Sequence, residues 1–183
     1  MAKVINGRSV VTNKARINYA HLVEPAEPMN GGDPVYSCCL VIPKDDTETV
    51  NAIKQAVKAA AEVGKDKVFN GKIPNNLKIP LRDGDDDRSD DENYKNCFFI
   101  NAKSKYKPRI VDLNKRDIND PSQIYSGMYA KAVLSFYAYS AAGNKGIACS
   151  LGDMQKVEDG ERIGGVVSAD VAFGSEDEES MPF

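Results

Sequence analysis

Aromatic and basic side chains alternate with apolar ones between Gly127 and Ala142, a pattern that suits the binding of bases and phosphates. Residues two apart in a strand lie on the same face, so one face is predicted to be apolar and buried. The other face offers tyrosines for stacking against bases and a lysine for phosphate. The apolar face is Met128, Ala130, Ala132, Leu134 and Phe136, and the other is Tyr129, Lys131, Val133, Ser135, Tyr137 and Tyr139.

Further basic and aromatic residues occur in or beside three other strand-like segments. If the strands close into a barrel, these residues line the same groove as the tyrosines and attract phosphates. Two alternatives stay open: each basic side chain is simply solvated, or the tyrosines pack beneath a helix or in a subunit interface. The candidates for nucleic-acid binding outside the tyrosine strand are Lys14, Arg16, Phe99, Lys103, Lys105, Tyr106, Lys107 and Arg109.

The net charge of −3 conceals an uneven distribution along the chain. Residues 170–183 include five acids and no base, and residues 82–92 include seven acids and two arginines, so each segment carries −5. The rest of the chain therefore carries +7. This basic body is suited to a polyanionic partner.

The last ten residues, 174–183, combine acids with a terminal phenylalanine. An acidic tail alone is usually only solubilising, but an aromatic ring beside the terminal carboxylate is unusual to leave in water. A partner pocket with an apolar floor and a basic rim would bind the ring, the carboxylate and the acids together. The candidate partner-binding residues are Glu176, Asp177, Glu178, Glu179, Met181, Pro182 and Phe183.

The elements that must position these residues are mostly strands. Alternation and apolar runs predict strands at 9–23, 35–42, 94–106, 108–113, 127–142 and 145–157. A helix that begins at Asp46 or Thr47 and ends near Gly64 follows the second strand. Gly143-Asn144 predicts a hairpin between the last two strands. This order predicts a mainly β fold, a small barrel with one helix between strands 2 and 3.

Residues 82–92 interrupt the strand pattern, and we interpret them as an exposed acidic loop in an insertion at about 82–93. Their spacing lacks the glycine and the glutamate that a calcium-binding loop requires. No cysteine pair has CxxC spacing, so we expect buried, reduced thiols and neither a metal site nor a cofactor. His21 is the single histidine and falls in a strand pattern, so no catalytic site is predicted. The cysteines are Cys38, Cys39, Cys97 and Cys149.

The sequence has no apolar run long enough to span a bilayer and no apolar N-terminal signal. We therefore expect a cytoplasmic protein without a membrane partner. The expected organisation is one binding domain at 1–168 and a disordered acidic tail at 169–183. The sequence leaves open whether the protein forms a homo-oligomer.

Two parts of the chain resemble known families. The ending Met181-Pro182-Phe183 is similar to the Ile-Pro-Phe that follows the acids of bacterial single-stranded DNA-binding proteins. Residues 125–139, 143–148 and 159–165 resemble a family of phage single-stranded DNA-binding proteins with an oligonucleotide/oligosaccharide-binding (OB) fold. The resemblance implies an OB-fold-like five-stranded antiparallel barrel that binds single-stranded DNA without marked sequence preference. It also implies action in phage DNA replication, recombination or repair in the bacterial host, and a tail that recruits replication or recombination proteins.

Two rival functions follow from other features of the sequence. A metal-dependent nuclease would use the acids between Asp83 and Glu92, although these form one low-complexity run rather than scattered ligands on strand ends. A phage structural or adaptor protein would use the sheet to bind protein, with its tyrosines inside a subunit interface. We expect a binding protein rather than an enzyme.

Overall fold

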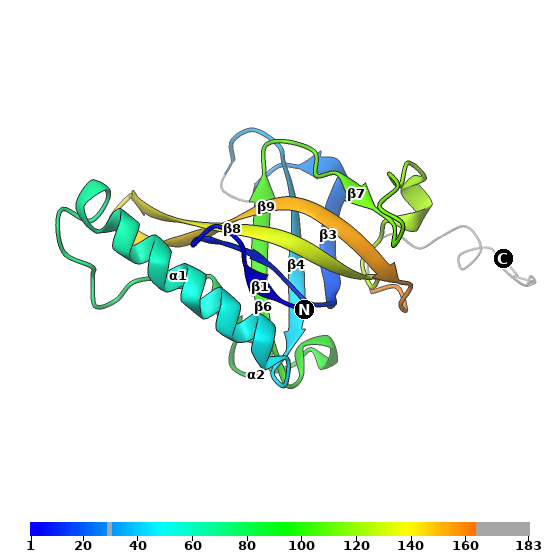
Figure 1. Cartoon of the computed structure of the whole chain (residues 1–183), viewed down its shortest axis with the longest axis horizontal. Coiled ribbons are helices and arrows are strands. Elements are labelled where there is room, and N and C mark those ends of the chain that lie inside the picture. Colours follow the sequence, from blue (N-terminus) through cyan, green and yellow to red (C-terminus); the bar gives the residue numbers. More distant parts are fainter. Residues whose placement is uncertain (29–30, 164–183) are drawn as a thin grey trace, which may run out of the picture.

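A closed β-barrel forms the centre of the computed structural model, which describes residues 1–28 and 31–163 (Figure 1). Five strands build it in the order β8, β3, β4, β6, β9, and pairing of β8 with β9 closes the ring. The pairs are antiparallel except β6 with β9, which is parallel. The predicted five-stranded OB-fold-like barrel is confirmed. Its strands are β3 (Ala15–Ala26), β4 (Val35–Pro43), β6 (Cys97–Ser104), β8 (Tyr129–Ala141) and β9 (Asn144–Glu158).

Several short strands, helices and turns lie outside the five barrel strands. On its edges β2 pairs with β8 and with β1, β5 pairs with β6, and β7 pairs with β9. The expected tail, from residue 169 onward, lies outside the described residues. The elements are β1 (Lys3–Val4), β2 (Ser9–Val11), α1 (Thr47–Lys67), β5 (Leu81–Asp83), α2 (Gly84–Asp87), the 3-10 turns η1 (Glu92–Tyr94) and η2 (Pro121–Gln123), and β7 (Ile110–Val111).

The strand predicted from 9 to 23 is two strands, β2 and β3, separated by a short break. The Thr12 amide donates to the carbonyl of Ala132 on β8 (3.0 Å), and the Ala132 amide donates to the Thr12 hydroxyl (3.1 Å). The Asn13 amide group donates to Asp46 (2.9 Å), and the Asn13 backbone donates to the Thr49 hydroxyl (3.0 Å). The break therefore ties the first strands to the start of α1.

The barrel interior confirms the predicted alternation. All five residues of the apolar face of β8 are buried, from Met128 to Phe136. Ile17 of β3, Leu40 of β4 and Ile100 of β6 meet them in the same core. The outer face of these strands is consequently left for other partners.

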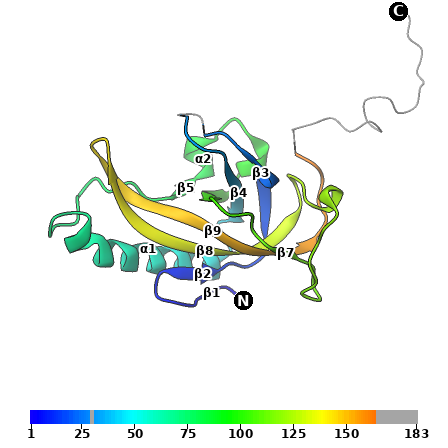
Figure 2. The same cartoon turned by 90° about the horizontal axis from the view of Figure 1, so that it is seen from above.

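Helix α1 covers one side of the β8–β9 hairpin, and β3, β4 and α2 lie on the other side (Figure 2). Asp46 caps the first turn of α1 by accepting from the Thr49 amide at 3.2 Å. The predicted end near Gly64 is wrong, because the helix continues to Lys67. Gly64 is a packing residue: a Cβ there would lie 2.3 Å from the Cβ of Ala138 on β8.

The acidic insertion is not the freely exposed loop that its composition predicted. It folds into β5, α2 and η1. Lys44 pairs with Asp83 and Asp85, both at 2.8 Å, and the Asn96 amide donates to Asp85. The bond to Lys44 lowers the pKa of both carboxyl groups, so they stay ionised well below neutral pH. Order in this segment comes from pairing its acids with basic side chains and backbone amides.

The insertion also covers part of the outer face of the barrel. Tyr94 packs edge-on against Phe99 at a centroid distance of 5.3 Å, over Cys39 and Val41 of β4. Asn18 donates to the buried Tyr94 hydroxyl at 2.8 Å. This second, smaller apolar cluster lies outside the barrel, and burial within it raises the pKa of the Cys39 thiol to about 11.

Gly64→Ala tests the close packing of α1 on the hairpin. Alanine favours a helix by about 1 kcal/mol over glycine, but the added methyl overpacks the contact with Ala138, which typically costs about 1–3 kcal/mol. We expect a net loss of stability in urea unfolding. Ala138→Gly in the same chain is expected to recover part of it, and a Gly64→Ala variant more stable than the parent would contradict the contact.

Tyr94→Phe tests how the insertion is held down. Removing the hydroxyl leaves the buried Asn18 amide without its acceptor, which costs about 1–3 kcal/mol. The matched control is Tyr106→Phe, because Tyr106 is 80% exposed and losing its hydroxyl leaves no buried donor unpaired. Equal unfolding free energies for the two variants would rule out the Asn18–Tyr94 bond as a support of the insertion.

Candidate nucleic-acid interface

The uncovered part of the outer face contains a cleft of about 510 Å³ between the β8–β9 hairpin and strands β4 and β6. OB-folds bind oligonucleotides on the face of their second and third strands, between the loops joining strands 1–2 and 4–5. Here β4 and β6 are those strands, and Pro28 and the hairpin supply the two loop sides. The residues with side chains suited to binding are Ser37, Arg82, Asn101, Lys103, Tyr137 and Tyr139.

The hairpin register brings both tyrosines into this cleft. Tyr137 pairs with Ala148 and Tyr139 with Gly146, so small residues stand opposite each ring. A Cβ at Gly146 would lie 2.8 Å from the Tyr139 hydroxyl and 2.7 Å from the Lys78 carbonyl oxygen. The predicted hairpin is confirmed, with its turn at Ala142 and Gly143, which both have positive φ.

Three of the predicted binding residues therefore converge: Lys103, Tyr137 and Tyr139. Tyr137 is 40% exposed, which leaves ring surface for a base. Asn101 and Arg82 complete the cleft but were not predicted to bind. Asn101 shares the strand parity of Lys103 and could have been found from that signal. Arg82 could not, because its place depends on how the insertion folds.

Phe99 was predicted to be an additional stacking residue, and the structure contradicts this. Its side chain is 1% exposed, because Tyr94 packs on it and the guanidinium groups of Arg82 and Arg88 lie 5.2 and 5.1 Å from the ring centroid. Strand parity places it correctly on the outer face. It could not reveal that the insertion covers that part of the face.

A second group of predicted residues lies at the other end of β8. Lys14 and Arg16 stack over Tyr129 at 5.3 and 5.9 Å from its ring centroid. Lys14 pairs with Glu158, which raises the pKa of the lysine. Arg16 donates to the carbonyl of Glu161 at 2.6 Å. These side chains are largely engaged with the protein itself.

The remaining predicted residues are dispersed. Lys131 lines a shallow depression with Lys115, and Lys105 and Tyr106 are exposed beyond the end of β6. Lys107 and Arg109 border a separate cavity of about 330 Å³, where Arg109 pairs with Asp117 at 2.5 Å. The structure thus does not gather the whole predicted set into one groove.

Nothing in the described residues groups three or more potential metal-ligating side chains around one point. The four cysteines are free thiols, three of them buried and Cys97 partly so. Across residues 1–28 and 31–163, helices are too short or too polar to cross a bilayer.

Comparison with known proteins agrees with this geometry. Residues 8–181 match the family described as Enterobacter phage Enc34, ssDNA-binding protein. Protein p50 of Acyrthosiphon pisum secondary endosymbiont phage 1 is 29% identical over 180 residues, covering 91% of this chain and 95% of that protein.

Solved structures show the same fold. The single-stranded DNA-binding protein of bacteriophage Enc34, solved in complex with single-stranded DNA, superposes with a TM-score of 0.71 at 25% identity, over 89% of this chain and 97% of that one. Bacteriophage T7 gp2.5, a single-stranded DNA-binding protein, shares the fold with a TM-score of 0.65 at 16% identity, over 96% of this chain and all of that one. The family is one of DNA-binding proteins rather than enzymes. With its OB-like barrel, its open cleft on β4 and β6 and a family match from residue 8 to residue 181, this chain belongs to the Enc34 family of phage single-stranded DNA-binding proteins.

Proposed function

We propose that this chain coats single-stranded DNA without marked sequence preference during phage DNA replication, recombination or repair in the bacterial host cell. The observation that carries the proposal is the convergence of Tyr137, Tyr139 and Lys103 in one open cleft on β4, β6 and the hairpin. The Enc34 relative, solved with single-stranded DNA, supports it.

In this proposal the cleft works by stacking and charge. Bases stack on Tyr137 and Tyr139, which tolerates any sequence because every base has a π face. Lys103 and Arg82 hold phosphates. Stacking on Phe99 and the bond to Asp87 (2.9 Å) hold the Arg82 guanidinium beside the cleft, although the carboxylate of Asp87 also offsets part of its charge.

Basic residues outside the cleft have a different role in this proposal. Their charges attract the phosphate backbone over a distance of about 10 Å at moderate salt and so speed encounter, without contacting bases. Pairing with Glu158 or Asp117 reduces this contribution for two of them. The residues concerned are Lys14, Arg16, Lys105, Lys107, Arg109 and Lys131.

The acidic tail, 174–183, has a regulatory and recruiting role in this proposal. Its acids compete with DNA for basic surface, and DNA binding frees the tail for replication or recombination proteins that receive Phe183. The support is its composition, four acids and a terminal phenylalanine, together with a body that carries the opposite charge.

Two single substitutions test the cleft. Tyr137→Ala is expected to weaken binding of a labelled oligothymidine roughly 5- to 150-fold, since stacking is worth about 1–3 kcal/mol per base. Lys103→Ala is expected to reduce the slope of log affinity against log salt by about 0.7, the share of one phosphate. Fluorescence anisotropy over a range of salt concentrations measures both.

Matched controls lie away from the cleft. Tyr106→Ala removes an exposed tyrosine beyond β6, and Lys58→Ala removes an exposed lysine of α1. Both are expected to bind nearly as the parent does. Equal losses in the controls and in the cleft variants would refute the assignment of the cleft, and no binding by the parent at low salt would refute the function.

Deleting 174–183 is expected to tighten binding of single-stranded DNA severalfold at low salt, because it removes four acids that compete for the basic surface. Replacing Glu176, Asp177, Glu178 and Glu179 by glutamine is expected to have the same effect. Phe183→Ala keeps these charges and is expected to leave DNA affinity unchanged. Weaker or unchanged binding after deletion would contradict tail competition.

A further inference from the structure

A second cleft, of about 620 Å³, lies on the same outer face, beside β3. It is separate from the cleft described above and shares no residue with it. One side comes from the middle of β3 and the other from the segments before β8 and after β9. Its aromatic and polar lining includes Asn18, Tyr19, His21, Tyr125, Ser126 and Arg162.

Tyr19 presents an aromatic ring to this cleft in an unusual backbone conformation. Its φ is +46°, which is rare for a bulky residue, and its side chain is 55% exposed. The pairing of β3 with β4 is irregular at this point, between Asn18 and His21. Such bulges re-aim a side chain, and strained residues of this kind cluster at functional sites.

Two side chains hold the strained turn in place. The Asn18 side-chain oxygen accepts from the Tyr19 amide at 2.8 Å, and the Ser126 hydroxyl accepts from the Ala20 amide at 3.0 Å. Asn18 is itself fixed by its bond to Tyr94. These bonds fix the backbone around Tyr19, so its solvent-exposed ring is held in a defined position.

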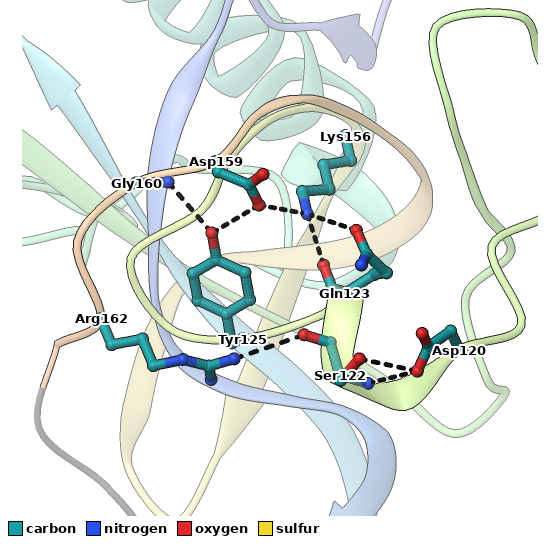
Figure 3. A network of polar contacts seen from close by, with 8 residues as sticks. All are labelled: Asp120, Ser122, Gln123, Tyr125, Lys156, Asp159, Gly160 and Arg162. Atoms are coloured by element: carbon teal, nitrogen blue, oxygen red, sulfur yellow. Dashed lines mark hydrogen bonds and ion pairs between the residues drawn. The ribbon is translucent and has the colours of Figure 1, made fainter. Parts of the chain in front are cut away.

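The opposite side of the cleft carries a positioned cation (Figure 3). The guanidinium of Arg162 lies 4.3 Å from the ring centroid of Tyr125, whose hydroxyl donates to Asp159 at 2.7 Å. Lys156, only 8% exposed, donates to the same Asp159 oxygen at 2.7 Å and to the Gln123 carbonyl at 2.8 Å. The Lys156 bond lowers the pKa of Asp159, so this support persists to acidic pH.

Close backbone packing fixes the segment that carries Arg162. A Cβ at Gly160 would lie 2.0 Å from the Gly127 carbonyl oxygen, and the Ile163 amide donates to the Ser126 carbonyl at 2.9 Å. The segment after β9 is thus held against the turn before β8 by close packing and a backbone hydrogen bond. Asp91 also borders the cleft, but its carboxylate accepts from the Asn93 amide at 2.9 Å.

Strand register connects the two clefts. His21 pairs with Ser37 on β4, and Ser37 pairs with Lys103 on β6, so the three side chains share the outer face in one row. His21 belongs to the second cleft and the other two to the first. Two inter-strand steps make the row about 10 Å long. The insertion covers the row in which Val41 pairs with Phe99, and it also buries Cys39 in the row between, whereas the row of Ser37 and Lys103 stays open.

We propose that the second cleft is a further nucleotide subsite, in which the ring of Tyr19 stacks on a base of the same DNA strand and Arg162 binds a phosphate. The inference rests on the proposed function and extends it: the DNA crosses the barrel along the row His21, Ser37 and Lys103. An aromatic face opposite a cation is the combination that binds single-stranded nucleic acid without sequence preference.

The test compares oligothymidines of about 4 and about 12 nucleotides, both within the range of about 4 to 16 nucleotides that one OB-fold occupies. Tyr19→Asn removes the ring but suits a positive φ. It is expected to weaken binding of the longer strand roughly 5- to 150-fold and to leave the shorter strand, held in the first cleft, nearly unchanged. Tyr19→Phe keeps the ring and is expected to bind both as the parent does.

Further variants separate the possible outcomes. Tyr137→Ala is expected to weaken both lengths, and Arg162→Gln is expected to weaken the longer strand and lower its salt slope by about 0.7. If the parent binds and Tyr19→Asn binds the longer strand equally well, the second subsite is refuted. Equal weakening on both lengths also refutes it, since Tyr19 then acts through the first cleft or the fold. A parent that binds neither length refutes the proposed function instead.

Discussion

The pairing of β8 with β9 is the constraint on which the rest of the structure depends. It closes the barrel, and it continues beyond the barrel as a hairpin that turns at Ala142 and Gly143. One face of the hairpin receives α1 through the contact of Gly64 with Ala138, and the other presents Tyr137 and its neighbours to the first cleft. The same ladder therefore supports the core and the candidate site, so substitutions that shift its register would alter both.

The acidic insertion divides the outer face of the barrel into a covered part and an open part. Its aromatic anchor, Tyr94, buries Phe99. Three of its acids pair with basic side chains, Asp83 and Asp85 with Lys44 and Asp87 with Arg82. The rows nearer the hairpin stay open, and the candidate site lies there.

Parity along single strands sufficed to predict much of this molecule. Alternation identified the buried face of β8 and the outward position of Lys103 and the tyrosines, because successive side chains of a strand point to opposite faces. The hairpin was predicted from its turn residues. Parity also assigned Phe99 to the outer face, which is correct. The prediction that its side chain is exposed for binding was wrong. Helix-stop signals wrongly placed the end of the helix near Gly64, since a close approach to a residue 74 positions away has no local signal.

The sequence by itself determined the fold class, the order of the strands and the basic character of the body, because these depend on local periodicity and composition. Only the tertiary structure decided which outward residues share a cleft. Tyr137 and Lys103 meet because the barrel curves the hairpin toward β6, whereas Tyr129 and Lys14 lie at the other end of the same strand. The second cleft, around Tyr19, depends on segments that meet only when the barrel has closed, and no spacing along the chain encodes that meeting.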